Sequence, residues 1–315
     1  DVVYDEVPPE LDLIDIYSNN TNNDTLAKVG NQITLRVESS EPIKAPTISI
    51  AARSGDGAAT LVNSADDLTA YTSNYTMLTG DTEGKVAFSV DYVDRAGNVG
   101  TQVTHLTDDG ADADNFNDLT TDSDNKLVTF DKTPPYFNET TAQGAGVISI
   151  SSNNDDNTLA KLGDVITLSL TSTEQIKTGS DPTVTINGNN ATVSRAADNK
   201  TFTATYTMSS TDGSSNISSI PFSISSYEDL AGNEGATVTN STTDGTTVKY
   251  DPVRPTLSNI VMVSNNDNNA YAKLADEIEL TFESSETINT PVVTMNSSSD
   301  GITVASTAAN EWKAT

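Results

Sequence analysis

The sequence contains no cysteine, one histidine and one tryptophan among its 315 residues. Without cysteine no disulfide can cross-link the fold. An exported protein of this kind needs another source of stability, and bound metal ions are the usual one. The lone histidine, His105, has no partner motif, and we expect it at a surface or a sheet edge. Zinc-ligand spacing, a nucleophile–base pair and a phosphate-binding loop are all missing, so we expect no enzyme.

Basic residues are also scarce: 16 lysines and arginines stand against 45 aspartates and glutamates, for a formal charge of −29. Nucleic acid and anionic membranes are bound through basic surface, so neither is expected as a partner. Such a charge is consistent with bound cations, a salty medium or solubility alone. No apolar run approaches the roughly 18 residues of a membrane-spanning helix, and direct membrane insertion is therefore not expected.

Hydrophobic residues make up 35% of the chain and aromatic residues 6%, which indicates thin cores such as those of all-β sandwiches. Helical periodicity is absent, and strict apolar–polar alternation recurs along the chain. The best alternating segments are Ile33 to Val37, Ile166 to Leu170 and Ile278 to Phe282, each followed by a further expected strand at 47–50, 183–186 and 292–295. About seven short strands per repeat predict an all-β fold of tandem immunoglobulin-like β-sandwich domains.

Short proline-containing joints separate the repeats, because proline fixes φ and cannot donate to a sheet ladder. The joints are Tyr4-Asp5-Glu6-Val7-Pro8-Pro9, Phe130-Asp131-Lys132-Thr133-Pro134-Pro135 and Tyr250-Asp251-Pro252-Val253-Arg254-Pro255. They predict a last-strand tail and linker at 1–9, repeat 1 at 10–131, a linker at 132–135, repeat 2 at 136–251, a linker at 252–255 and an incomplete repeat 3 at 256–315. We expect the third sandwich to be completed by residues outside this sequence or by a strand of another copy.

A second motif, Asp94-Arg95-Ala96-Gly97-Asn98, returns as Asp229-Leu230-Ala231-Gly232-Asn233. Together with the joint Asp131-Lys132-Thr133-Pro134-Pro135, the Asn-rich loops and the Ser-Glu-x-Ile segments, it resembles bacterial immunoglobulin-like repeats of giant, often calcium-dependent surface adhesins and related extracellular fibres. The resemblance covers essentially the whole chain, although the joints at Asp5 and Asp251 lack the threonine. It implies a structural or adhesive role at the cell surface, with calcium at the joints, and it implies no ligand.

Acidic residues from distant parts of each repeat are expected to meet at one tip. In an immunoglobulin-type sandwich the chain enters at the end that carries the B–C and F–G loops, so a joint aspartate, a B–C glutamate and the F–G turn converge there. Carboxylate and carbonyl oxygens of this kind suit Ca²⁺. The alternative is that Asp, Gly and Asn merely form turns, but turn chemistry does not explain an acid that recurs at all three joints. The predicted calcium ligands are Asp5, Glu41, Asp94 and Asn98, then Asp131, Glu174, Asp229 and Asn233, and finally Asp251 and Glu286.

Two other polar segments allow more than one interpretation. The Asn-rich loops that begin at Ser18, Ser152 and Ser264 should face the following joint, where they either lend oxygens or stand as solvated loops. The acidic insertion between Asp108 and Asp124 fits no EF-hand spacing and is either a second calcium loop or a disordered acidic loop.

Three functions compete at this point. The chain is a calcium-stiffened spacer of a cell-surface adhesin, or a repeating subunit of an extracellular filament in which copies share strands, or a carbohydrate-binding module. The third needs exposed aromatic platforms, whereas most aromatic residues here fall on core-facing strand positions. Expected partners are therefore neighbouring repeats of the same or another copy, including a homopolymer.

Overall fold

The computed structural model describes residues 4–51, 53–54, 60–61, 68–104, 127–138 and 146–315. Throughout these ranges every regular element is a β-strand, and no helix is present that could cross a membrane. The chain falls into two compact units. The first runs from the N-terminus to Ser209 and includes Ser218–Lys249, and the second combines Ser210–Ile217 with Tyr250–Thr315. His105 and the acidic insertion lie outside the described residues.

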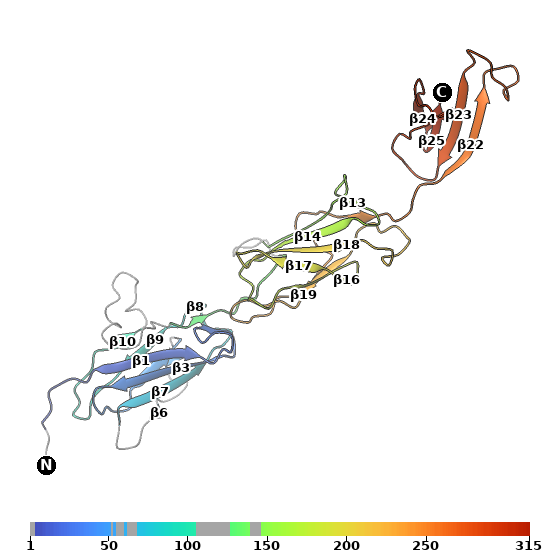
Figure 1. The fold of residues 1–315 in the computed structure, drawn as a ribbon. Helices are drawn as coiled ribbons and strands as arrows, with labels where there is room; N and C mark the ends of the chain where they lie inside the picture. The colour runs from blue at the N-terminus through green and yellow to red at the C-terminus, as the bar shows by residue number, and fades with distance from the viewer. Residues whose placement is uncertain (1–3, 52, 55–59, 62–67, 105–126, 139–145) are drawn as a thin grey trace. The chain divides into compact units, whose positions relative to one another are not determined.

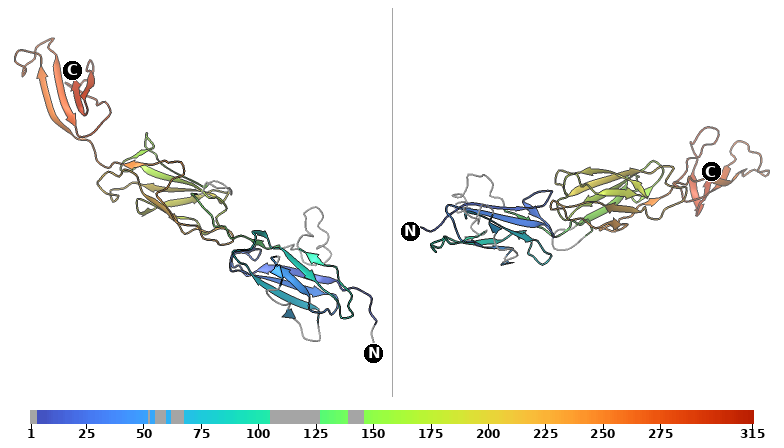
Figure 2. Two further views of the ribbon diagram at one scale, coloured as in Figure 1. Left: turned by 180° about the vertical axis from the view of Figure 1, so that it is seen from behind. Right: turned by 90° about the horizontal axis from the view of Figure 1, so that it is seen from below.

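The first sandwich consists of two facing four-stranded sheets and a small third sheet (Figures 1 and 2). Its strands are β1 (Leu11–Ser18), β2 (Leu26–Ala27), β3 (Gln32–Ser39), β4 (Thr47–Ile50), β5 (Arg53–Ser54), β6 (Thr60–Leu61), β7 (Ala70–Thr76), β8 (Gly84–Lys85), β9 (Phe88–Asp91), β10 (Val103–Thr104) and β11 (Thr129–Phe130). One sheet has the order β1-β3-β7-β6 and the other β10-β9-β4-β5. These are strands A-B-E-D facing G-F-C-C′, which is the strand order of an immunoglobulin-like sandwich.

The second sandwich repeats this order with little change. Its strands are β12 (Val147–Ser152), β13 (Leu159–Ala160), β14 (Val165–Thr171), β15 (Thr183–Ile186), β16 (Asn189–Asn190), β17 (Thr192–Arg195), β18 (Thr201–Thr207), β19 (Phe222–Ser225), β20 (Val238–Thr239) and β21 (Lys249–Tyr250). The order β12-β14-β18-β17 is again A-B-E-D, and β16-β15-β19-β20 is C′-C-F-G. The chain is thus a tandem of immunoglobulin-like folds.

The cores of both sandwiches come from the alternating strands. Ile33, Leu35 and Val37 of β3 are completely buried. In the second sandwich Phe202 of β18 meets Phe137 edge-on, with ring centroids 6.0 Å apart. Alternation places one face of each strand inside and leaves the other for polar residues, which explains how so few apolar residues suffice.

The second unit contains one sheet, built from β22 (Leu257–Ser264), β23 (Ile278–Ser284), β24 (Val304–Ala308) and β25 (Glu311–Ala314) in the order β22-β23-β25-β24. This is again A-B-E-D, and Ile260 and Met262 of β22 remain 62% and 60% exposed. The strand expected at 292–295 is wrong, because Met295 forms only an isolated bridge with Ser298. Its counterparts β4 and β15 pair with β9 and β19, and the sequence offers no such partner here.

Candidate metal centres

Three carboxylates of the first sandwich lie together at its entrance. Asp5 belongs to the entering segment, Glu41 follows β3, and Asp94 follows β9. One oxygen from each lies within 4.8 Å of the other two. An isolated bridge between Ile43 and Asp94 holds the B–C loop against the F–G turn. The topology thus brings the three predicted acids to one tip.

The Asp-x-Ala-Gly-Asn sequence folds into a closed turn around its own aspartate. The Asp94 carboxylate accepts hydrogen bonds from the backbone N–H groups of Gly97 and Asn98, the latter at 2.7 Å. Gly97 has φ of 109°, which L side chains rarely adopt, so the glycine is needed for this shape. The Asn98 amide donates to Asp94 Oδ2 at 2.7 Å and to the Asp5 carbonyl at 3.2 Å. Asn98 therefore ties the turn to the entering segment.

The second sandwich builds the same arrangement around Asp131, Glu174 and Asp229, again with one oxygen from each within 4.8 Å of the others. Asp229 accepts hydrogen bonds from the N–H groups of Gly232 at 2.6 Å and Asn233 at 2.8 Å. The Asn233 amide donates to Asp229 Oδ2 at 2.8 Å and to the Asp131 carbonyl at 3.1 Å.

Every joint aspartate also has a turn-forming role. Asp5, Asp131 and Asp251 each accept, through Oδ1, the backbone N–H two residues later, at 3.0, 3.0 and 2.9 Å. This bond is typical of Asx turns and uses one oxygen of each carboxylate. The expectation that turn chemistry does not explain the recurring joint aspartate is therefore wrong, because the same local turn forms at all three joints. The turn does not account for Glu41 and Glu174 beside the first two aspartates.

Threonine in the middle joint has a partner that the sequence pattern did not indicate. Glu83, beside β8, accepts hydrogen bonds from the Lys132 N–H at 2.9 Å and the Thr133 hydroxyl at 2.7 Å. The joints with valine in place of Thr133 cannot make the hydroxyl bond. Glu83 therefore fastens this joint to the first sandwich.

Crowding of the carboxylates is expressed in their pKa values. Burial, with the charges of Asp131 and Asp229, raises the pKa of Glu174 to about 8. Burial and the neighbouring acids likewise raise the pKa of Glu41 and of Asp131. Burial acts in the same direction on Asp94, but hydrogen bonds from the Asn98 side chain and from backbone N–H groups outweigh it and lower its pKa. A cation bound nearby would favour the ionised form of such crowded carboxylates and lower their pKa values.

A cavity of about 420 Å³ adjoins the second group and is lined by Asp131, Glu174 and Lys200, among others. The Lys200 ammonium donates to the Thr173 carbonyl at 3.1 Å and lowers the pKa of Glu174 by its charge. The donor set is all oxygen and mostly anionic, and the cavity leaves room for water ligands. This is the chemistry that a hard divalent cation such as Ca²⁺ requires.

The third predicted pair is less complete. Asp251 forms its Asx turn in the second unit, and Glu286 has a buried Oε1 atom without a hydrogen-bond partner among the described residues. The other two centres each take their third acid from the F–G turn, and this repeat has no counterpart of that turn in the sequence. The described residues accordingly give no three-carboxylate group here.

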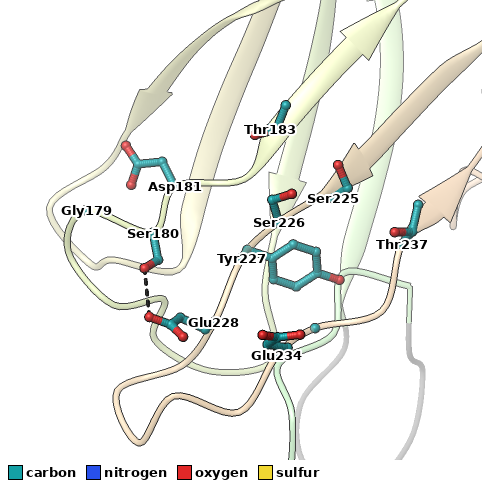
Figure 3. Close-up of a pocket in the computed structure, with 11 residues that line it drawn as sticks. Gly179, Ser180, Asp181, Thr183, Ser225, Ser226, Tyr227, Glu228, Glu234 and Thr237 are labelled. Carbon is teal, nitrogen blue, oxygen red and sulfur yellow. Dashed lines mark hydrogen bonds between the residues drawn. The ribbon is translucent and has the colours of Figure 1, made fainter. Parts of the chain in front are cut away.

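An open, polar cavity of about 620 Å³ lies elsewhere on the second sandwich (Figure 3). Its acids are largely paired: Glu228 with Lys177 at 2.6 Å and with the Ser180 hydroxyl at 3.0 Å. Tyr227, in the middle of the close-up, is buried, and its hydroxyl donates to the Ala236 carbonyl at 2.7 Å. Burial raises its pKa to about 12. The cavity therefore offers no exposed aromatic platform of the kind that a carbohydrate-binding module uses.

No protein-family model matches the chain, and no curated protein matches its sequence. Among solved structures, the titin I-band fragment I67-I69 and its E-to-A mutated variant each match 98% of this chain and 88% of theirs, at 12% and 11% identity and a TM-score of 0.38. The structure of Rst D1-D2 matches 78% of this chain and 100% of its own, at 12% identity and a TM-score of 0.27. With TM-scores this low, the immunoglobulin-like assignment rests on the strand order described above.

Proposed function

We propose that the joints of this immunoglobulin-like array bind calcium and that the array is the extracellular shaft of a cell-surface adhesin. The observation that carries the proposal is the recurrence of one arrangement at two successive joints. In each, an acid of the linker meets an acid of the B–C loop and an acid of the F–G turn. A cation bound there would connect the linker to the domain that follows it.

Calcium is favoured over other cations by the donor set. Ca²⁺ takes six to eight oxygens in flexible geometry, from carboxylates, carbonyls and water. Asp131, Glu174 and Asp229 would supply the carboxylates, and the adjoining cavity would admit water. Asn98 and Asn233 stay candidate ligands, although their amide nitrogens already hold the turn and the linker together.

The stabilisation expected from such sites is large for a small sandwich. Extracellular calcium modules bind with dissociation constants of roughly 10⁻⁴ to 10⁻³ M. At about ten to a hundred times that concentration of free calcium, each site adds about 1.4–2.7 kcal/mol to the free energy of unfolding. In a chain without cysteine, the free energy of calcium binding would take the place of the stabilisation that disulfides provide in other exported proteins.

The alternative is a subunit of an extracellular filament. It is favoured by the second unit, where Ile260 and Met262 on one strand of a single sheet remain exposed. A strand or sheet of another copy would cover them by β-augmentation. Imaging of the native material distinguishes the two functions, since a shaft gives single threads and a strand-sharing subunit gives ordered helical fibres.

Calorimetric titration of calcium into this chain tests the metal proposal directly. We expect binding that is lost at one joint in Asp94→Ala and at the other in Asp229→Ala, with the remaining joint unaffected in each variant. A matched control is Asp244→Ala, an exposed acid whose carboxylate bonds locally to Thr246. Absence of calcium binding by the unmodified chain at millimolar calcium contradicts the proposal.

A further inference from the structure

The first sandwich has a loop that reaches across the joint. This A–B loop, residues 19–31, contacts the F–G turn of the second sandwich, residues 229–233. The Asn20 amide, which is buried, donates to the Ala231 carbonyl at 2.9 Å, and the Lys28 ammonium donates to the Gly232 carbonyl. In return, Lys177 of the second sandwich donates to Asn22 Oδ1 at 2.8 Å. Two of these contacts use donors of the loop and one uses the Asn22 oxygen, so the loop makes contacts that neither expectation, oxygen ligands or a solvated loop, included.

In the corresponding loops of the other two repeats, the equivalent asparagine and lysine form their contacts within their own loop. Asn154, the counterpart of Asn20, donates its amide to Asp164 Oδ2 at 2.7 Å, and Asn266 donates to Asp276 Oδ2 at 2.8 Å. The lysines form ion pairs with the same aspartates: Lys161 Nζ lies 3.6 Å from Asp164 Oδ1, and Lys273 Nζ lies 3.1 Å from Asp276 Oδ1. One aspartate thus engages both groups inside each of these loops.

The first loop differs at this position, where it carries Asn31 in place of the aspartate. Asn31 Oδ1 still accepts the Lys28 backbone N–H at 2.8 Å, just as Asp164 accepts the Lys161 N–H at 2.9 Å, so the turn is preserved. A neutral amide, however, has one oxygen fewer and no charge. In the second sandwich one oxygen, Asp164 Oδ2, accepts both the Asn154 amide and the Lys161 N–H. The neutral Asn31 oxygen is a weaker acceptor than a carboxylate oxygen for the Asn20 amide, and the Asn31 NH2 group, which takes the place of the second oxygen, does not attract the Lys28 ammonium.

We propose that Asn31 is a positioning residue that makes the A–B loop of the first sandwich a docking surface for the Asp-x-Ala-Gly-Asn turn of the following repeat. With asparagine there, Asn20 and Lys28 are released to the carbonyls of the partner turn. With aspartate there, as in the other two repeats, the same groups close on their own loop. The fitting partner is a turn with outward carbonyls and a glycine, since a Cβ at Gly232 would lie 2.8 Å from Asn22 Nδ2.

The proposal does not depend on calcium, and its test is run in chelator. Because the chain has no cysteine, the exposed Thr76 and Thr203 can be replaced by cysteine and spin-labelled for a distance measurement between the two sandwiches. We expect a narrow distance peak in the parent in chelator, which added calcium narrows further. Asn31→Asp should lose that peak while both sandwiches keep their melting temperatures, because aspartate is accommodated at this position in the other repeats.

Two variants that remove a donor and one matched control complete the experiment. Asn20→Ala and Lys28→Met remove the donors without adding negative charge, and each should also lose the narrow peak. Asp164→Asn makes the reciprocal change in the second sandwich and should leave the peak unchanged. The proposal is overturned if the parent shows no narrow peak, if Asn31→Asp retains it, or if Asn31→Asp loses it while Asn20→Ala and Lys28→Met both retain it.

Discussion

Glu174 is the residue through which pH should act on the joint. Its pKa is about 8 in the folded chain, against 4.5 for an ordinary glutamate. Between pH 4.5 and pH 8 the Glu174 carboxyl is protonated in the folded chain and ionised in the unfolded chain. The free energy of unfolding in chelator should therefore fall as the pH rises from about 5 to above 8. We expect the second sandwich to melt a few degrees lower at pH 8.5 than at pH 6, on the usual scale of about 2–8 °C per kcal/mol.

The control for this effect is Glu174→Gln, which keeps the shape and removes the ionisation. It should melt at nearly the same temperature at both pH values in chelator. Carboxyls with lowered pKa, such as Asp164 and Asp198, change stability only in more acidic solution and do not enter this range. Equal melting temperatures of the parent chain at pH 6 and pH 8.5 would contradict the raised pKa of Glu174.

Lys200 acts as a tethered cation beside the same carboxylates. Its positive charge partly offsets their repulsion, and it should therefore compete with a bound metal ion. Lys200→Met should tighten calcium binding at this joint by about two- to fivefold, which corresponds to roughly 0.4–1 kcal/mol for a partly exposed charge pair. Titration calorimetry measures this, with Lys161→Met as the control. Weaker calcium binding in Lys200→Met would reverse the role assigned to the lysine.

The F–G turn is the element that connects the proposed metal site, the linker and the neighbouring loop. Gly97 and Gly232 occupy equivalent places in it, with φ of 109° and 89°, but only Gly232 has neighbours close to an added Cβ. Alanine at either position should cost about 1–2 kcal/mol in its own sandwich for the strained backbone. Only Gly232→Ala should also change the side-chain amide signals of Asn20 and Asn22 in NMR spectra. Equal changes in both variants would mean that the turn makes no contact across the joint.

Sequence patterns predicted much of these elements. The apolar–polar alternation around Leu35 and Leu168 predicted the strands there, and the Asp-x-Ala-Gly-Asn motif predicted the turn. Both predictions succeeded because strand alternation and turn formation depend on neighbours within a few residues. The convergence of Asp131, Glu174 and Asp229 followed from topology alone. In contrast, the sequence did not reveal the contact of Asn20 with Ala231, since it joins residues 211 positions apart through a backbone carbonyl. The expected strand at 292–295 failed because a strand needs a partner, which the local pattern does not encode.

In the whole molecule, each of the first two joints has its own group of three carboxylates, whereas the described residues give no such group at the joint of Asp251. The middle joint combines its proposed cation site with a hydrogen bond from the Thr133 N–H to the Asp131 carboxylate and one from the Asn233 amide to the Asp131 carbonyl. Removal of the Asp131 carboxylate should therefore weaken this joint and leave the sandwich cores intact. Asp131→Ala should therefore lower calcium binding at the middle joint, while the buried pair Phe137 and Phe202 keeps its near-ultraviolet and NMR signatures. Loss of those core signatures would show that Asp131 supports the fold of the sandwich itself.

The central claim is that calcium stiffens the joints, and small-angle X-ray scattering of this chain in calcium and in chelator tests it most directly. We expect chelation to broaden the distribution of interatomic distances and to lower the melting temperature measured on the same samples, and we expect Asp131→Ala in calcium to reproduce part of the change. Identical scattering curves and identical melting temperatures in the two buffers would contradict it, and the joint acids would then be turn-forming residues only.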